Sequence, residues 1–400
     1  MKKAYVIDAL RTPIGKYGGS LSNIRPDDLA ALVIKKLIDR NPEIPIDKIE
    51  DVILGCANQA GEDNRNVARM ASLLAGLPVE TAGVTINRLC ASGMQAVIDA
   101  TRAVKLGEGD VFIAGGTESM SRAPWVIAKS ETQFGRNPQI FDSTIGWRFT
   151  NKKLTEKHFP YSMGETAENI ATKYNIGRKE QDEFAFASQK KYKNAFEQGK
   201  FNNEITPVSV PQRKKDPLVI DRDEHPRPDV SLEALSELKP AFIKGGTVTA
   251  GSSSGINDGA AALIIVSEDV VKQYNLRPLA KIISSAVAGV DPSFMGIGPV
   301  PATRKALKRA GLETNDIDLI ELNEAFSSQS IACIRELNLN EEIVNVNGGA
   351  IALGHPLGCT GARIITTLVH EMSRRENCRY GLATLCVGVG QGTAMIFEKV

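Results

Sequence analysis

The 400-residue chain is 42% apolar and 24% charged, so it can bury a sizeable core and is not disordered. Its 48 Lys and Arg nearly balance 47 Asp and Glu, and the net charge of +1 excludes a strongly basic nucleic-acid binder. The longest strongly apolar run, residues 260–266, is far too short to span a membrane. None of the six cysteines forms a C-x-x-C pair, so no zinc or thioredoxin-type site is predicted. We expect a cytoplasmic protein with reduced thiols that binds neither nucleic acid nor a membrane.

Apolar runs typical of buried strands alternate with helical patterns along the chain. Asp8 interrupts the N-terminal apolar run too early for a signal peptide, so this run predicts a first strand. Residues 28–40 predict a helix after an Asp cap. Buried strands are predicted at residues 111–114, 261–266, 317–322, 343–346 and 382–385. This alternation predicts an α/β fold.

Residues 121–249 differ in composition from the rest of the chain. They contain 14 of the 22 aromatic residues but only 7 of the 35 glycines, and they carry 21 Lys or Arg against 17 Asp or Glu. Residues 178–200 show a partly helical pattern. Irregular stretches are predicted around Pro211, Pro217, Pro226, Pro228 and Pro240. We interpret the segment as an insertion that is rich in long charged helices.

The parts that flank this insertion share a weak internal repeat. Residues 51–55 and then 84–87 precede a cysteine turn, whereas residues 318–322 and then 344–347 precede a histidine turn. A duplicated α/β unit explains this order better than chance. We therefore predict an N-terminal half (residues 1–120 plus 250–275), a loop domain (121–249) and a C-terminal half (276–400).

Cys90 follows a predicted strand that ends at Asn87, and a helical pattern begins just after it. A cysteine at a helix N-terminus faces the positive end of the helix dipole and oriented backbone N–H groups, which favour the reactive thiolate. A buried structural cysteine is an equally weighted alternative.

His355 lies in a glycine-rich turn and precedes Pro356 at the expected start of a helix. The helix dipole disfavours the imidazolium there, so a neutral ring able to accept a proton is expected. Simple packing among glycines is the alternative. The chain has four histidines and five glycines surround this one, which favours a function.

Three further turns carry candidate chemistry. After a predicted strand, Cys386 begins a turn rich in glycine whose backbone N–H groups can hold an oxyanion, with a plain β-bend as the alternative. Asn323 follows another predicted strand and can orient a water through its amide. Residues 251–255 fit the nucleophile elbow of hydrolases, but residues 256–259 predict a turn where that motif needs a helix. We expect a ligand-binding loop at this place.

Together these motifs resemble the thiolase family, in family order and over the whole chain. The matching segments are the Cys90, His355 and Cys386 turns and residues 115–121, 163–168, 247–251 and 323–326. The resemblance implies a five-layer αβαβα fold made of two similar halves and a loop domain. It also implies an acyltransferase (acetyl-CoA C-acyltransferase) that uses coenzyme A and acyl-CoA thioesters as substrates. No permanently bound cofactor or metal is expected, and the implied assembly is a homotetramer of two tight dimers.

The resemblance further implies roles for single residues. Cys90 is the expected nucleophile, and His355 is expected to activate it. Cys386 is expected to protonate the acetyl-CoA enolate and, in the reverse direction, to deprotonate acetyl-CoA. An ordinary thiol pKa near 8.5 suits this proton transfer. His355 and a water held by Asn323 are expected to bind the enolate oxygen, and the N–H groups of Cys90 and Gly388 the second oxyanion. The expected CoA contacts are Met163, Arg227, Phe242, Ala250, Ser254, Ala325 and Phe326. A solvated charge for Arg227 and core packing for Phe242 are the alternatives.

Within the family, residues 55–66, 144–149, 223–228 and 295–299 are similar to 3-oxoadipyl-CoA (β-ketoadipyl-CoA) thiolases, which implies a dicarboxylic substrate. Ser162 replaces the His of many short-chain biosynthetic members, which argues against a strict acetoacetyl-CoA enzyme, and Ser252 replaces a usual Asn. Candidate cations for the substrate carboxylate are Arg65, Arg69 and Arg148.

Other functions remain open from the sequence. A general 3-ketoacyl-CoA thiolase and an acetoacetyl-CoA thiolase (acetyl-CoA acetyltransferase) are the nearest alternatives. A ketosynthase-like condensing enzyme would lack the Cys386 motif, and a non-catalytic acyl-CoA-binding relative would lack one of the Cys or His residues. A scaffolding protein would not be acylated at all.

Overall fold

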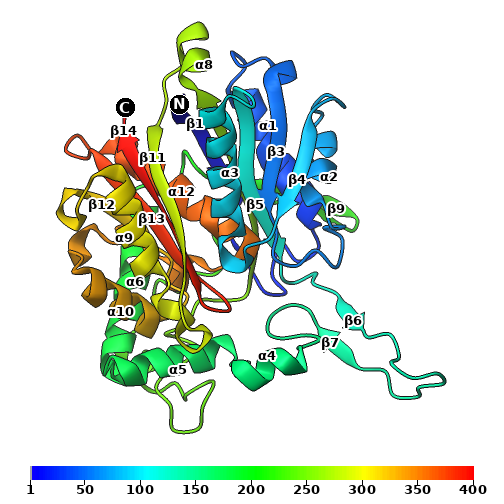
Figure 1. Cartoon of the computed structure of the whole chain (residues 1–400), viewed down its shortest axis with the longest axis vertical. Helices are drawn as coiled ribbons and strands as arrows, with labels where there is room; N and C mark the ends of the chain where they lie inside the picture. The colour runs from blue at the N-terminus through cyan, green and yellow to red at the C-terminus, as the bar shows by residue number, and fades with distance from the viewer. Residues whose placement is uncertain (1) are drawn as a thin grey trace.

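The computed structural model describes residues 2–400, and both ends of the chain lie at the same end of the molecule (Figure 1). The N-terminal half contains β1 (Ala4–Arg11), β2 (Gly15–Lys16), α1 (Pro26–Arg40), β3 (Ile49–Gly55), α2 (Val67–Leu74), β4 (Ala82–Ile86), η2 (Leu89–Ala91), α3 (Ser92–Leu106), β5 (Val111–Ser119), β10 (Asn257–Ser267) and α8 (Glu268–Gln273). The C-terminal half contains β11 (Ala280–Gly289), η3 (Pro292–Ile297), α9 (Pro299–Ala310), β12 (Leu319–Leu322), α10 (Ser327–Leu337), α11 (Ala350–Leu353), α12 (Leu357–Arg374), β13 (Tyr380–Val387) and β14 (Gln391–Lys399). Between β5 and β10 of the N-terminal half, the chain forms β6 (Trp125–Ile127), β7 (Ile140–Asp142), α4 (Lys152–Lys157), α5 (Met163–Lys173), α6 (Arg178–Glu197), β8 (Val208–Gln212), β9 (Lys215–Ile220) and α7 (Leu232–Ser236).

The two halves repeat one topology. In the N-terminal half, β1 pairs antiparallel with β10, β10 antiparallel with β5, and β5, β3 and β4 run parallel. In the C-terminal half, β11 pairs antiparallel with β14, β14 antiparallel with β13, and β13 parallel with β12, while a single parallel bridge joins Ile320 to Val344. The internal repeat of the sequence therefore corresponds to a repeated fold. A short pairing of β1 with β11 joins both halves into one ten-stranded sheet.

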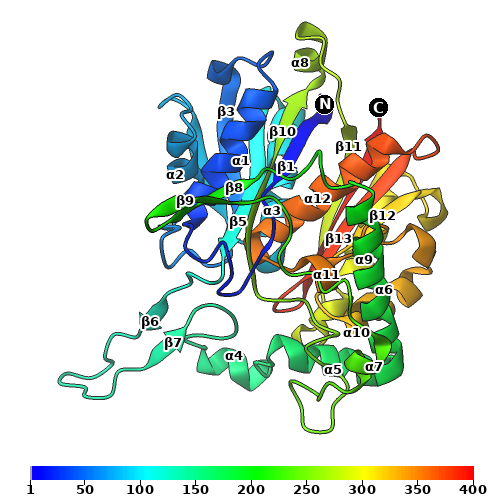
Figure 2. The same cartoon turned by 180° about the vertical axis from the view of Figure 1, so that it is seen from behind.

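Three large apolar cores lie between the five layers of the predicted αβαβα fold. The middle core lies on both sides of the central helical layer, and each of the other two lies under an outer helical layer. Helices α1 and α2 bury the outer face of the N-terminal strands, and α9 and α10 bury the outer face of the C-terminal strands. Helices α3 and α12 lie between the two halves and pack against both (Figures 1 and 2). The predicted five-layer fold is confirmed.

Strand β10 illustrates why a central strand contains a continuous apolar run. Leu263 and Ile265 belong to the middle core, whereas Ile264 and Val266 belong to the outer core under α1. Because successive side chains point to opposite faces and both faces are covered, residues 260–266 of β10 are apolar at every position instead of alternating with polar ones.

Residues 121–249 lie mostly outside the sheet. Figures 1 and 2 show α4 and α5 beyond one end of the strands and the β6–β7 hairpin projecting from the body. Several long charged helices were expected here, but the described residues of this segment form one, the 20-residue α6. Pro211 and Pro217, expected in irregular structure, lie in the two-stranded β8–β9 sheet, where edge positions tolerate proline. No helix among residues 2–400 is long and apolar enough to cross a membrane.

Three other local predictions were wrong. Helix α1 begins at Pro26, so Asp27 and Asp28 lie in its first turn instead of capping it. Residues 256–259, predicted as a turn, include the start of β10 at Asn257. Residues 343–346 form no strand, because Asn345 has a left-handed φ of 46° that interrupts the extended chain.

Candidate active site

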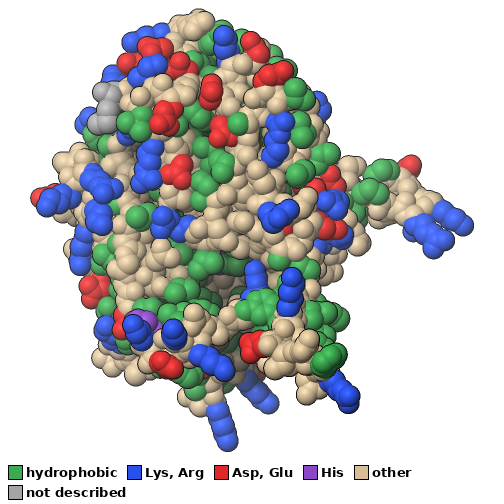
Figure 3. All heavy atoms as spheres, turned by 45° about the vertical axis from the view of Figure 1, so that its right-hand side comes forward, with side chains coloured by type: hydrophobic (Ala, Val, Ile, Leu, Met, Phe, Trp, Pro, Cys, Tyr) green, Lys and Arg blue, Asp and Glu red, His purple; other side chains and the backbone are tan. Residues whose placement is uncertain are grey.

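Cys90 lies where two cavities meet. The larger cavity has a volume of about 580 Å³ and the smaller one about 320 Å³, and Cys90, Met163 and Leu357 line both. Figure 3 shows the surface hollowed between the main body and the lower part of the molecule, with hydrophobic side chains around the hollow. A ligand that reacts at Cys90 can therefore extend in two directions.

The turn from β4 into α3 positions Cys90. Leu89 adopts a left-handed φ of 46°, and Cys90 follows it in the 3-10 turn η2, directly before α3. Burial raises the pKa of the Cys90 thiol to about 11, although the N–H groups of Gly388 and of Cys90 itself act to lower it. The prediction of a thiolate at Cys90 is therefore wrong for the free protein, because the desolvation that raises the pKa outweighs the N–H groups that lower it. Cys90 must pass its proton to a neighbour in order to react.

His355 lines the larger cavity together with Cys90. Its Nδ1 lies 2.7 Å from Oγ1 of Thr360, which itself donates to the carbonyl oxygen of Pro356 at 2.8 Å. The Thr360 oxygen therefore accepts a hydrogen bond from Nδ1–H, and Nε2 keeps a free lone pair. Burial, assisted by the charge of Arg363, lowers the pKa of His355 to about 3. The ring is neutral as predicted, and burial is the main cause of the lowered pKa.

Cys386 lies near the end of β13 in an apolar cluster with Met163, Met295 and Phe326. Burial raises the pKa of its thiol well above the ordinary value, and the neighbouring Cys90 raises it further. The expectation of an ordinary thiol pKa was therefore wrong. The turn after Cys386 connects β13 to β14, so it is a β-bend. Gly388 and Val389 of this turn also line the smaller cavity, as expected for a turn that faces a ligand.

Asn323 lies immediately after β12 and is almost fully buried. Its backbone N–H donates to the carbonyl of Thr384 at 3.0 Å, which places it beside the strand that carries Cys386. Both polar atoms of its side-chain amide are buried without a hydrogen-bond partner among residues 2–400. Since buried polar groups are normally satisfied, this amide is suited to hold a small polar molecule such as water.

Glycines allow α3 and α12 to approach closely, which brings Cys90 and His355 into one site. A Cβ on Gly93 would lie 2.7 Å from the carbonyl oxygen of Gly358, and one on Gly116 would lie 2.0 Å from the same oxygen. A Cβ on Gly361 would lie 2.2 Å from the backbone nitrogen of Met94. None of these distances is compatible with a side chain at the present helix spacing.

All seven residues predicted to contact CoA line the larger cavity. They are Met163, Arg227, Phe242, Ala250, Ser254, Ala325 and Phe326. Phe242 packs edge-on against Phe326 with 5.9 Å between ring centroids but is 42% exposed, so core packing alone does not explain it. Residues 251 and 253–255 also line this cavity, as expected for a ligand-binding loop.

The smaller cavity contains two polar residues that the sequence did not single out. Asn58 donates through Nδ2 to the hydroxyl of Ser143 at 3.0 Å. Glu118 accepts hydrogen bonds from the N–H groups of Ala57, Asn58 and Gly358 at 2.8, 3.1 and 2.8 Å. Glu118 thereby ties the 57–58 turn to the first turn of α12, where helix geometry favours an anion. Both residues lie inside the family-like motifs, which is the signal that could have identified them.

Of the three candidate cations for a substrate carboxylate, only Arg148 lines the smaller cavity. Arg69 donates instead to the carbonyl oxygen of Val79 at 2.9 Å, and Arg65 is exposed. The structure therefore brings one of the three to the reacting cysteine.

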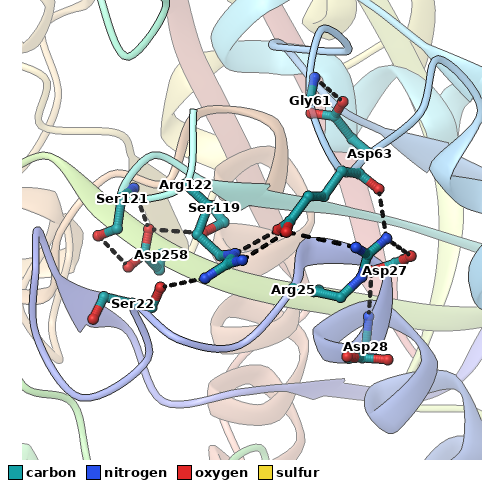
Figure 4. A network of polar contacts seen from close by, with 11 residues as sticks. Ser22, Arg25, Asp27, Asp28, Gly61, Asp63, Ser119, Ser121, Arg122 and Asp258 are labelled. Carbon is teal, nitrogen blue, oxygen red and sulfur yellow. Dashed lines mark hydrogen bonds and ion pairs between the residues drawn. The ribbon is translucent and has the colours of Figure 1, made fainter. Parts of the chain in front are cut away.

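An ion-pair network outside this cavity supports the loop that carries Asn58 (Figure 4). Arg122 pairs with Glu62, and Arg25 lies between Glu62 and Asp27. The network links the loop to the end of β5 and to the start of α1, which holds one wall of the smaller cavity in place.

Among residues 2–400, one group could hold a metal ion: Cys56, Asp63 and Glu118, whose ligand atoms lie within 4.8 Å of one another. The carboxylate of Glu118 already accepts three backbone hydrogen bonds, so we assign no metal there.

Two family models match the sequence: "Thiolase, N-terminal domain" over residues 4–269 and "Thiolase, C-terminal domain" over residues 276–399. The chain belongs to the thiolase family. The predicted family and the predicted enzyme class are thus confirmed, and this thiolase is an acyltransferase.

Characterised relatives of this thiolase match it over its full length. It is 53% identical to a β-ketoadipyl-CoA thiolase of Acinetobacter baylyi and 54% identical to a 3-oxoadipyl-CoA/3-oxo-5,6-dehydrosuberyl-CoA thiolase of Escherichia coli, with 100% of both chains covered in each case. Its fold matches human mitochondrial 3-ketoacyl-CoA thiolase, solved in complex with CoA, at a TM-score of 0.92 and 43% identity, over 100% of this chain and 98% of that one.

Proposed function

We propose that this thiolase cleaves 3-oxoadipyl-CoA with CoA to give acetyl-CoA and succinyl-CoA, through an acyl group on Cys90. The observation that carries the proposal is the position of Cys90 between two cavities, with His355 and Cys386 on the walls of the larger one. We infer the substrate from the two bacterial relatives, which are named as thiolases of 3-oxoadipyl-CoA (β-ketoadipyl-CoA). General 3-ketoacyl-CoA thiolysis is the second candidate, because the human structural relative carries that name.

In the first half-reaction, Cys90 transfers its proton to Nε2 of His355 while its sulfur attacks the keto carbon C3. Since burial disfavours a free thiolate and a free imidazolium, this transfer must accompany C–S bond formation. The C2–C3 bond then breaks, and its electron pair forms the acetyl-CoA enolate, which takes the proton of Cys386. The succinyl group stays on Cys90 as a thioester.

In the second half-reaction, the Cys386 thiolate takes the proton of the CoA thiol. The CoA sulfur attacks the acyl carbon, and the Cys90 sulfur leaves and recovers its proton from His355. The N–H groups of Cys90 and Gly388 act to lower the pKa of the Cys90 thiol, and we assign to them the oxyanion at the acyl carbon. We assign the enolate oxygen to His355 and to a water on the free amide of Asn323.

We place CoA in the larger cavity. Among the described residues, 2–400, Arg227 is the one Lys or Arg that lines this cavity, and its charge suits a phosphate group of CoA. The half-exposed ring of Phe242 suits the adenine. Met163, Ala250, Ser254, Ala325 and Phe326 supply the remaining assigned contacts.

We also propose the domain division given above and a homotetramer built from two tight dimers. Strand β4 forms an exposed sheet edge, which a second copy would cover. The β6–β7 arm exposes Trp125, Ile127 and Phe134, which suits a further contact between copies. Six free cysteines are consistent with the reducing cytoplasm that we propose as its location.

The test is the CoA-dependent release of acetyl-CoA from 3-oxoadipyl-CoA and from acetoacetyl-CoA, measured side by side. A strong preference for 3-oxoadipyl-CoA is expected. Equal or better use of acetoacetyl-CoA would replace the proposal by a general thiolase activity.

A further inference from the structure

We propose that Arg148 binds a carboxylate at the far end of the acyl chain and so selects dicarboxylic 3-ketoacyl-CoA substrates. The inference rests on the proposed reaction at Cys90 and assigns the smaller cavity to the acyl chain. It therefore adds a specificity-determining residue to the site.

Within residues 2–400, Arg148 is the only Lys or Arg that lines the smaller cavity. Its single side-chain hydrogen bond within residues 2–400 runs from Nη1 to the carbonyl oxygen of Ser143 at 3.3 Å, and none of the ion pairs there involves it. A guanidinium has five N–H donors, so most of its donors are free for a ligand. Its planar fork matches a carboxylate with two parallel hydrogen bonds.

Three other polar side chains of the cavity are already engaged. The Nδ2 of Asn58 donates to Ser143, and the indole N–H of Trp147 donates to the carbonyl oxygen of Tyr161 at 3.0 Å. Glu118, the only carboxylate on the wall, accepts three backbone N–H groups. Arg148 thus remains the one cationic group available to an anionic ligand.

The rest of the wall fits the methylene groups between the keto carbon and the carboxylate. It is largely apolar, with Leu89, Met120, Ile145, Leu357 and Val389. In 3-oxoadipyl-CoA the carboxyl carbon lies three bonds from the keto carbon, roughly 4 Å in an extended chain. One apolar cavity with one cation therefore matches a short chain with one terminal charge.

The loop that carries Arg148 has a defined conformation. The N–H of Thr144 donates to Oδ1 of Asp142 at 2.8 Å, Gly146 takes a φ of 89°, and Trp147 is anchored as described above. A guanidinium held by such a loop loses less conformational freedom when it binds an anion.

The test compares wild type, Arg148→Gln, Arg148→Lys and the exposed control Arg65→Gln. The thiolysis substrates are 3-oxoadipyl-CoA, 3-oxohexanoyl-CoA, in which a methyl group replaces the carboxylate, and acetoacetyl-CoA. Arg148→Gln should lower kcat/KM for 3-oxoadipyl-CoA by roughly 10- to 100-fold, mainly through KM, and leave the two uncharged substrates within about threefold. Arg148→Lys should recover part of the loss, because the point charge stays but the fork is lost. Arg65→Gln should match wild type.

The outcomes separate this inference from the proposed function. If wild type prefers 3-oxoadipyl-CoA and Arg148→Gln keeps that preference, the role of Arg148 is wrong while the proposed function stands. An equal loss with all three substrates indicates a structural role and also overturns the inference. If wild type itself shows no preference for 3-oxoadipyl-CoA, the proposed substrate and the proposed carboxylate site are both refuted.

Discussion

The spacing of α3 and α12 can be tested by replacing Gly361 with alanine. A Cβ at this position would lie 2.2 Å from the backbone nitrogen of Met94, whereas ordinary contacts begin near 3.4 Å, so the helices must separate by about 1.2 Å. Overpacking of this kind costs about 1–3 kcal/mol. For a 400-residue chain, this corresponds to a decrease in Tm of about 1–4 °C.

The functional effect should be larger than the loss of stability. Cys90 lies two residues before the start of α3 and His355 two residues before the start of α12, so the separation displaces one reacting group from the other. A misplacement near 1 Å can reduce the rate by roughly 100-fold. Thermal unfolding and thiolysis kinetics should be compared with Gly177→Ala, a control at which a Cβ meets nothing within 4 Å. If Gly361→Ala retains wild-type Tm and kcat, the claim that this close approach positions the catalytic pair is refuted.

Two further predictions address proton transfer and pH. Cys386→Ala should still become acylated by acetyl-CoA but should no longer exchange the α-protons of bound acetyl-CoA with deuterium from solvent; normal exchange would remove Cys386 from the proton step. Although burial acts to raise the pKa of Glu371, hydrogen bonds from Arg375, Asn347 and Arg374 lower it to about 2. This depressed pKa stabilises the fold above about pH 4.5, and the stabilisation is lost as the pH falls toward 2. Glu371→Gln should therefore lower Tm most at neutral pH, and a Tm difference that grows toward low pH would contradict the assignment.

Strand and helix positions near the site could be predicted from the sequence because they depend on local patterns. The apolar run of β10 and the Pro356 start of α12 are examples, and the family-like motifs located Cys90, His355 and Cys386. The approach of α3 to α12 could not be predicted in this way, because it depends on glycines from three different segments that meet only in the folded chain.

The protonation states of the site were predicted less well, and burial is the reason. Helix position alone favoured a thiolate at Cys90, but the sequence did not show that the sulfur is desolvated. The same holds for Cys386, whose apolar neighbours come from α5, η3 and residues 325–326. Likewise, three arginines were equivalent candidates in the sequence, and only their position in space distinguishes Arg148.

The central claim is that Cys90 carries the acyl group cut from a 3-ketoacyl-CoA. The most direct measurement is the intact mass of the protein, followed by peptide mapping, after incubation with 3-oxoadipyl-CoA in the absence of free CoA. We predict one succinyl group on the peptide that contains Cys90, removed again by added CoA, and none on Cys90→Ala. A stable adduct on another residue, or an unchanged adduct on Cys90→Ala, would contradict the account.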